Sequence, residues 1–287
     1  MHQGLSTSEI RAYVRDGILF PVQVLPVARA SALRRAFEDL EESLGGRPEP
    51  TRWTNLCFPW AYDLTMQPSV LDSVEALLGP EIIVLGAMIL CKHPGHDAYV
   101  AWHQDGAYAQ EDAAPALSAW IALADSTPAN GCMRVIPGSH RELLPHRDET
   151  NPANLLRAGL LRAGRTVTAA VDEEQAVDVV LRAGEMSLHH NRVVHGSRAN
   201  CGDDKRIGFV VRYTTPAARS RGFPMVRARG TADCAHLQLA GRPPESEPDE
   251  ALAGYLRFCA AMKQATGAGG KRDESALTGA DEPQDHH

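Results

Sequence analysis

The sequence has no run of about 18 uninterrupted apolar residues, the length that a membrane-spanning helix needs. Its start, MHQGLSTSEI, lacks both the basic residues and the apolar stretch of a signal peptide. The six cysteines are scattered and form no Cys-x-x-Cys pair, which favours reduced thiols over a disulfide framework or a zinc ribbon. We therefore expect a cytoplasmic protein that does not associate with membranes.

Basic residues are not in excess either. Lys and Arg number 29 against 36 Asp and Glu, so the formal net charge is −7. No segment interleaves basic with aromatic residues as a nucleic-acid groove requires, so nucleic acid is not an expected partner. The 287 residues, 44% of them hydrophobic, can bury a full core, and we expect one domain over residues 1–265. The polar, Gly-rich residues 266–287 are expected to form a disordered tail.

Apolar periodicity predicts helices near the start of the chain and strands after them. Helices are expected over residues 8–16, 28–44 and 70–78, the last with Ser69 as N-cap, and again over 251–265. Short β-rich runs separated by Gly, Pro and Asn turns predict an antiparallel barrel or sandwich with helices outside it. These runs are 82–92, 117–124, 133–136, 177–181, 186–190 and 207–213.

One long segment interrupts the β-rich runs. Residues 140–175 are rich in Arg and Ala and have no clear period. Long insertions of this kind in a compact domain are usually lids or binding loops, and we expect that role here.

A candidate metal site lies in the segment Trp102-His103-Gln104-Asp105-Gly106. In an extended strand, positions i and i+2 project to the same face, so His103 and Asp105 could bind one ion. His195, after a later strand, offers a third ligand. Two imidazoles and one carboxylate form the facial triad of non-haem Fe(II) oxygenases. A His-x-Asp alone is common by chance, however, and its histidine could equally cap a strand or hydrogen-bond in the core.

A second feature makes the metal interpretation more specific. Arg206 follows His195 by eleven residues and opens the apolar run 207–213. A guanidinium can bind a carboxylate through two parallel hydrogen bonds, which Lys cannot match. Arg206 could therefore bind one carboxylate of a dicarboxylate cosubstrate.

From about residue 8 to residue 215 the chain resembles the phytanoyl-CoA dioxygenase family of Fe(II)/2-oxoglutarate-dependent oxygenases. The motifs that carry the resemblance are YVRDG at 13–17, WHQD at 102–105, Trp120, NGCMRVIPGSH at 130–140, HGS at 195–197, Asn200 and Arg206. The resemblance implies a mainly β fold, with a double-stranded β-helix (jelly roll, cupin-like) core, flanking α-helices and the metal at the open end.

The resemblance also implies roles for individual residues, with Fe(II), 2-oxoglutarate and O2 as cofactors. His103, Asp105 and His195 would be the iron ligands, and Arg206 the partner of the C5 carboxylate of 2-oxoglutarate. Trp120 and Met88 match positions that contact the cosubstrate in relatives. For these last two residues, core packing is an equally good explanation.

Other histidines compete for the third ligand position. His189 and His190 are adjacent, so they point to opposite faces of a strand and only one could face the metal. His195 is preferred because Arg206 lies at the family spacing from it. His140 belongs to a Pro-Gly-Ser-His turn with an expected structural role, whereas His93 and His96 flank Pro-Gly and are expected in a loop.

The implied activity is hydroxylation of an aliphatic C–H bond of a small molecule, with 2-oxoglutarate converted to succinate and CO2. A natural-product intermediate of secondary metabolism or an amino-acid-like compound is the expected substrate. Asp105 disfavours halogenation, because related halogenases have Gly or Ala at that position. Desaturation, epoxidation and ring closure stay open, and so does a non-catalytic metal-binding β-barrel, although a mere metal site has no use for Arg206.

Substrate contacts are not determined by the sequence. Candidate lining groups are Trp53, Asn55, Phe58, Trp60, Tyr108, Arg134, Arg192 and the insertion 140–175. Each of these side chains is more typical of packing or of solvated surface. The arginines of the insertion favour an acidic substrate only weakly, because Arg is abundant throughout the chain.

Overall fold

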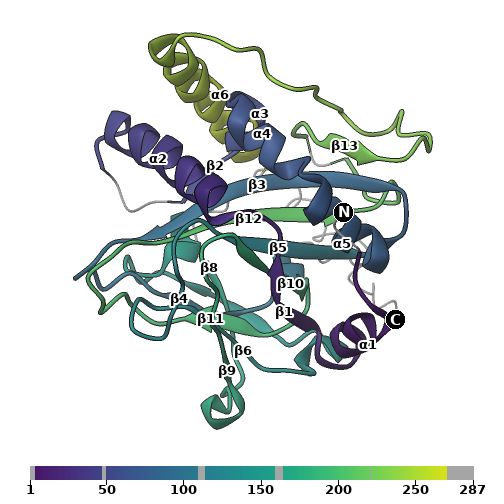
Figure 1. The fold of residues 1–287 in the computed structure, drawn as a ribbon, viewed down its shortest axis with the longest axis vertical. Helices are drawn as coiled ribbons and strands as arrows, with labels where there is room; N and C mark the ends of the chain where they lie inside the picture. Colours follow the sequence, from purple (N-terminus) through teal and green to yellow (C-terminus); the bar gives the residue numbers. More distant parts are fainter. Residues whose placement is uncertain (1–3, 47–49, 109–113, 159–163, 221, 270–287) are drawn as a thin grey trace, which may run out of the picture.

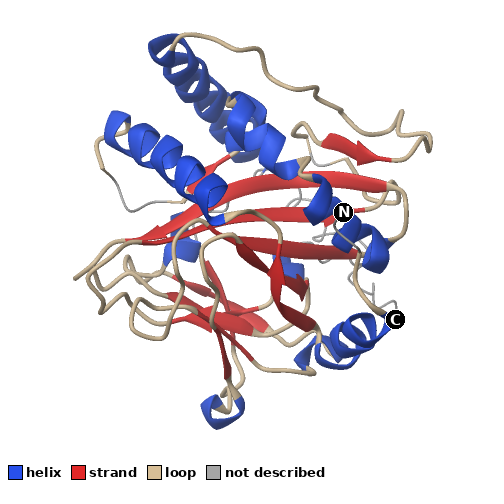
Figure 2. Cartoon of the chain, viewed as in Figure 1, coloured by secondary structure: helices blue, strands red, loops and turns tan. Residues whose placement is uncertain are grey.

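A computed structural model describes residues 4–46, 50–108, 114–158, 164–220 and 222–269. Its centre consists of two antiparallel sheets, and most of the helices lie beyond the larger one (Figures 1 and 2). The predicted double-stranded β-helix with flanking helices is therefore confirmed. Among the described residues, no helix is both long enough and apolar enough to cross a membrane.

The larger sheet has seven strands. Six run in the order β1 (Ile18–Gln23), β10 (Glu185–His190), β5 (Ala116–Ala122), β12 (Arg206–Thr214), β3 (Ile82–Lys92) and β13 (Val226–Arg229), and β2 (Thr51–Arg52) also pairs with β3. The smaller sheet has the order β4 (Val100–His103), β11 (His195–Ser197), β6 (Met133–Val135) and β9 (Val177–Val179). Strands that are distant in sequence thus become neighbours.

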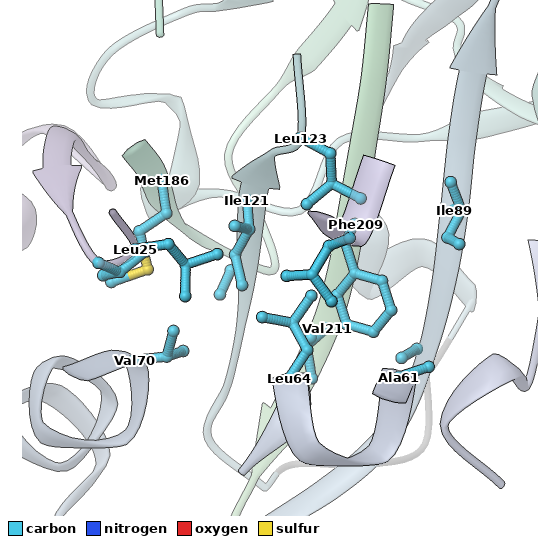
Figure 3. Packing of buried hydrophobic residues seen from close by; sticks show 14 of the residues in the cluster. Leu25, Ala61, Leu64, Val70, Ile89, Ile121, Leu123, Met186, Phe209 and Val211 are labelled. Carbon is cyan, nitrogen blue, oxygen red and sulfur yellow. The ribbon is translucent and has the colours of Figure 1, made fainter. Parts of the chain in front are cut away.

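Most of the helices lie on the outer side of the larger sheet, whereas α1 (Thr7–Asp16) contacts its edge strand β1 (Figure 1). The other helices are α2 (Val27–Ser43), α3 (Thr54–Cys57), α4 (Pro59–Thr65), α5 (Pro68–Leu78) and α6 (Pro248–Gly269). Alternate side chains of β12, among them Phe209 and Val211, point toward this helical layer and meet Ala61 and Leu64 of α4 (Figure 3). The intervening Val210 belongs to a second apolar cluster, on the inner face of the sheet. The central strands are continuously apolar because both of their faces are covered.

The N-termini of α1 and α5 are determined by neighbouring side chains, and that of α5 differs from the prediction. The side chain of Ser6 caps α1 and forms a capping box with Glu9. The prediction that Ser69 caps α5 is wrong. The helix begins at Pro68, which suits a first helical position because its missing N–H needs no partner. The Ser69 hydroxyl instead donates to the carbonyl oxygen of Val24, 2.7 Å away, and so ties α5 to the chain after β1.

The insertion 140–175 is more ordered than its sequence pattern indicates. It contains a hairpin of β7 (His146–Glu149) and β8 (Gly164–Val167), and the short 3-10 turns η3 (Leu155–Ala158) and η4 (Glu173–Gln175). The hydroxyl of Thr166 donates to the carbonyl oxygen of Trp102 (2.9 Å), so the hairpin packs against β4. Residues 159–163 lie outside the described part of the chain.

Phe209 provides a test of the helix-to-sheet core. Its side chain is fully buried and its ring lies beside that of Trp60. We expect Phe209→Ala to lower the free energy of unfolding by about 3–5 kcal/mol, because a cavity replaces the ring. Urea denaturation measures this change. Leu256→Ala, at a side chain 51% exposed, should change stability by less than about 0.5 kcal/mol, and an equal loss in both variants would contradict the assignment.

Candidate metal centre

Two histidines face each other across neighbouring strands of the smaller sheet. His103 ends β4 and His195 begins β11, and the two are direct register partners. Their ring centroids are 4.1 Å apart. A glycine allows this close pairing, because a Cβ on Gly196 would lie only 2.9 Å from the carbonyl oxygen of Val100. The strand pairing therefore brings together two residues separated by most of the barrel sequence.

Asp105 reaches the same point by a different route from the one predicted. Strand β4 stops at His103, and Asp105 opens the 3-10 turn η1 (Asp105–Tyr108). The expectation that both side chains project from one extended strand is wrong, although the two do converge. His103 Nε2 lies 3.7 Å from Asp105 Oδ1. The turn, and not strand alternation, directs the carboxylate toward the imidazole.

The three side chains could hold one metal ion. One ligand atom from each of His103, Asp105 and His195 lies within 4.8 Å of the others, and all three residues are buried. Nδ1 of each histidine lies about 3 Å from a backbone carbonyl oxygen, that of Ala101 (2.9 Å) or Val193 (3.0 Å). Since a carbonyl only accepts, Nδ1 carries the proton and the lone pair of Nε2 is left for a metal. This donor set fits a 2-His-1-carboxylate iron site.

A row of polar side chains on the larger sheet holds the carboxylate from the opposite side. His189, Ser118 and Arg212 are neighbours in register on β10, β5 and β12. Ser118 Oγ donates to Asp105 Oδ2 (2.8 Å), and Arg212 Nη2 donates to Oδ1 (2.5 Å). His189 Nε2 lies 3.7 Å from Oδ2. Both oxygens of Asp105 are thus held in place before any metal binds.

Burial and neighbouring charges set the protonation of the site. Burial by itself raises the pKa of Asp105. Attraction to Arg212 and to the neighbouring imidazoles outweighs this, so the pKa stays well below its usual value. The pKa of His195 is well below its usual value because of burial and of repulsion from His103 and His189. An ionised carboxylate beside a neutral imidazole is the state that binds a divalent metal.

Gln104, between two of these residues, connects the site to the insertion. Its side chain is fully buried and donates to the carbonyl oxygens of Glu142 (2.7 Å) and Arg192 (2.5 Å). Its own oxygen accepts from the backbone N–H of Leu144 (2.8 Å). The start of the insertion is therefore fixed to the chain segment that carries the candidate ligands.

Arg206 lies on the same inner face of the larger sheet, six residues before Arg212 on β12. Its guanidinium is buried and stands 5.2 Å from the ring of Trp120. It donates from Nε to the carbonyl oxygen of Gly131 (3.1 Å) and from Nη2 to Ser197 Oγ (3.2 Å). Gly208 makes room for the indole, because a Cβ there would overlap Trp120 at 2.0 Å. Burial lowers the pKa of Arg206 to about 10, so it remains a cation at neutral pH.

Met88 and Trp120 lie at one level of the larger sheet, meaning one row of residues that are paired across neighbouring strands. Val210 on β12 pairs with Met88 on one side and with Trp120 on the other. All three belong to the apolar cluster between the two sheets. This level separates the polar row around Asp105 from the cationic end at Arg206.

A second buried basic side chain lies beside Arg206. Lys92 is its register partner on β3 and is fully buried. Lys92 Nζ lies 2.7 Å from Ser197 Oγ, the same hydroxyl that Arg206 contacts, and also donates to the carbonyl oxygen of Arg198. Within the described residues, no salt bridge joins either cation to a carboxylate.

Three other histidines of the sequence, His140, His190 and His93, make their contacts away from this centre. His140 Nε2 is 3.2 Å from the carbonyl oxygen of Val14, and so holds its turn against α1. His190 points away from Asp105 and stacks near His140, with centroids 5.2 Å apart. His93 Nε2 binds Glu41 Oε1 (2.8 Å) on the outer side.

A second cluster also has the composition of a metal site. The ligand atoms of Glu41, Cys91 and His93 lie within 4.8 Å of one another. The second oxygen of Glu41 accepts from Lys205 Nζ at 2.8 Å, so both of its oxygens have protein partners. Burial raises the pKa of the Cys91 thiol, which disfavours the thiolate that a metal would need. Glu41 thus links α2 to the larger sheet through its contacts with His93 and Lys205.

Several residues considered as substrate contacts have other roles. Phe58 and Trp60 pack with the core on the helical side. Trp53 and Asn55 are buried at the start of α3, with the ring of Trp53 edge-on to Phe258. Arg134 binds Glu173 and Asp178. The side chain of Arg192 is exposed, and that of Tyr108 lies outside the described part of the structure.

The sequence did contain signals for the residues that were missed. Arg212 lies six positions after Arg206 on a strand, and an even spacing places the two on one face. Lys92 is the one charged residue in the apolar run 82–92. His189 was considered only as a rival ligand, and Ser118 gave no such signal, since only strand pairing brings it to Asp105.

Ser118 provides a test of how Asp105 is held. We expect Ser118→Ala to weaken Mn(II) binding by about tenfold, because the carboxylate loses a hydrogen bond that orients it. Calorimetric titration of the metal-free protein measures the affinity. Ser73→Ala is the matched control, since its buried hydroxyl donates to a backbone carbonyl within α5. Equal affinities for the Ser118 variant and the unmodified protein would rule out this role.

Comparisons with known proteins agree with this geometry. The family model "Phytanoyl-CoA dioxygenase (PhyH)" matches residues 13–208. The non-heme monooxygenase ThoJ in its apo form superposes with a TM-score of 0.73 at 29% identity, covering 90% of this chain and 96% of that one. The carbocyclase SnoK from nogalamycin biosynthesis superposes with a TM-score of 0.57 at 26% identity, covering 85% and 94%.

Curated sequences give a shorter match. Phytanoyl-CoA dioxygenase of Arabidopsis thaliana is 29% identical over 132 residues, which cover 44% of this chain and 42% of that protein. The match thus spans less than half the length of this relative. The family model, in contrast, covers more than half of the chain and includes the candidate ligands and Arg206. The chain therefore belongs to the phytanoyl-CoA dioxygenase (PhyH) family.

Proposed function

We propose that the chain is an Fe(II)/2-oxoglutarate-dependent dioxygenase that hydroxylates an aliphatic C–H bond of a small molecule and releases succinate and CO2. The observation that carries this proposal is the pairing of a buried His-Asp-His group with a buried arginine on one interior surface. A metal site alone would not need the arginine. Together the two could bind a metal chelator that carries a second carboxylate.

In this proposal each residue has a defined task. His103, Asp105 and His195 hold Fe(II), which activates O2 together with 2-oxoglutarate when both are bound. Arg206 binds the C5 carboxylate, with Trp120 and Met88 beside the cosubstrate. The surrounding apolar cluster excludes water from the site.

The wider assignment follows from the same interpretation. Residues 1–265 would act as one catalytic domain in the cytoplasm, with the insertion 140–175 near the entrance. The tail predicted over residues 266–287 starts too early, since α6 continues to Gly269, and residues 270–287 lie outside the described residues. The substrate would be a natural-product intermediate or an amino-acid-like compound, and neither a membrane nor nucleic acid would be a partner. The likeness to SnoK, an enzyme from nogalamycin biosynthesis, supports a natural-product substrate.

Ring closure is the second candidate reaction. SnoK is described as a carbocyclase, and the two folds superpose over most of both chains. Hydroxylation and cyclisation would use the same iron site and would differ in how the substrate is placed. Mass spectrometry separates them, because hydroxylation adds one oxygen to the substrate whereas cyclisation removes two hydrogens.

Succinate release tests the enzyme against a non-catalytic metal-binding barrel. With Fe(II), 2-oxoglutarate, ascorbate and air, we expect the protein to form succinate even without added substrate. Asp105→Ala should lower this rate at least about 100-fold, because a charged ligand is lost. Chromatography with mass detection quantifies the succinate. Equal background amounts from both proteins would exclude the oxygenase.

The role of Arg206 is tested separately from metal binding. We expect Arg206→Ala to raise the KM for 2-oxoglutarate about 10- to 100-fold, because a charge-assisted pair of hydrogen bonds is lost. The affinity for Mn(II) should be nearly unchanged. Arg35→Ala, at an exposed position of α2, should leave both quantities unaltered. Loss of metal binding in the Arg206 variant would refute this division of roles.

A further inference from the structure

Lys92 and Arg206 form an unusual pair of buried basic side chains. They are direct register partners on β3 and β12, and both side chains are almost completely shielded from solvent. Both contact Ser197 Oγ, at 2.7 Å from Lys92 Nζ and 3.2 Å from Arg206 Nη2. The two nitrogens are therefore less than about 6 Å apart, a distance at which like charges repel strongly in a buried site.

We propose that Lys92 completes the carboxylate site at Arg206 and takes up one proton from solvent when the distal carboxylate of 2-oxoglutarate binds there. This inference rests on the proposed function, and it adds a proton to the binding step. The amine, R–NH2, becomes R–NH3⁺ with a proton from water or buffer, and no other bond changes. The carboxylate then lies beside two cations and not one.

The surroundings of Lys92 support a neutral amine before binding. Burial and repulsion from Arg206 lower the pKa of Lys92 to about 5. Its hydrogen-bond partners, the hydroxyl of Ser197 and the carbonyl oxygen of Arg198, carry no charge. Asn200 Nδ2 donates to the backbone carbonyl oxygen of Lys92 (2.9 Å) and is also neutral. An incoming carboxylate would be the missing negative charge.

Few other groups near Lys92 could supply or take the proton. The Cys132 thiol faces both cations, and burial raises its pKa to about 11. Burial also raises the pKa of Cys91, the preceding residue on β3. Both thiols are therefore protonated at neutral pH, with or without an anion. The exposed side chain of Arg198 is paired with Glu173.

Proton uptake can be measured directly by titration calorimetry. The Mn(II)-loaded protein is titrated with 2-oxoglutarate at neutral pH in two buffers that differ in protonation enthalpy. We expect an uptake of ~1 proton per ligand, and a Kd that rises by up to about tenfold per pH unit above neutrality. Pyruvate chelates the metal with the same keto-acid group but has no distal carboxylate, so it should bind without this uptake.

Two variants assign the proton to its residue. Lys92→Met should bind 2-oxoglutarate with no uptake and with a Kd that does not change with pH. Lys205→Met is the matched control, since this lysine pairs with Glu41 on the outer side, and it should retain full uptake. Uptake that persists in Lys92→Met, or that is equal for pyruvate, overturns the inference while leaving the oxygenase proposal intact. Failure of 2-oxoglutarate to bind the unmodified protein overturns both.

A measurement without ligand keeps the test valid if Lys92→Met binds poorly. The unfolded chain holds a proton on Lys92 up to about pH 10.5, whereas the folded chain releases it near pH 5. The unfolded state thus binds more protons in this window, so Lys92 makes the free energy of unfolding rise with pH. Lys92→Met should lose this part of the slope and be more stable than the unmodified protein near pH 7. An unchanged slope would show that Lys92 is charged in the folded protein and would refute the proposal.

Discussion

The pairing of β11 with β4 is the contact on which the rest of the site depends. It sets His195 opposite His103 in register, and Gly196 lets the two backbones approach closely. A shift of one residue would turn one imidazole out of the barrel, because strand side chains alternate between faces. The backbone ladder therefore determines the geometry of the candidate metal centre before any side-chain contact does.

Along the inner face of the larger sheet, the side chains change in character from one row of paired residues to the next. The first level is polar, and there Asp105 pairs with the cation Arg212 and accepts a hydrogen bond from Ser118. The next level is apolar, and the far level carries the Arg206 cation beside the buried amine of Lys92, with no carboxylate of the described residues paired to either. A ligand with a chelating end and an anionic end matches this order, since each end meets its complement in a low-dielectric interior. The unpaired positive charge of Arg206 is the feature that favours such a ligand.

Much of the fold and part of the site could be predicted from the sequence. The strand 82–92 and the helices near residues 8–16 and 28–44 have long, regular apolar patterns, and the structure has them within a residue. Strand β1 and the short helices α3 and α4 were missed, because they are brief and are stabilised mainly by packing against the sheet. The turn at Asp105 was taken for a strand, since sequence spacing alone does not distinguish the two.

The sequence by itself determined an antiparallel β architecture with outer helices, because apolar periodicity is a local property. The jelly-roll core and the candidate ligands were implied by short motifs that resemble those of a known family. Only the tertiary structure decided which distant residues meet. Strand pairing places Ser118, His189 and Arg212 around Asp105, and it sets Lys92 beside Arg206. The physical reason is that register between strands far apart in the chain is selected by the packing of the whole barrel, which no local pattern records.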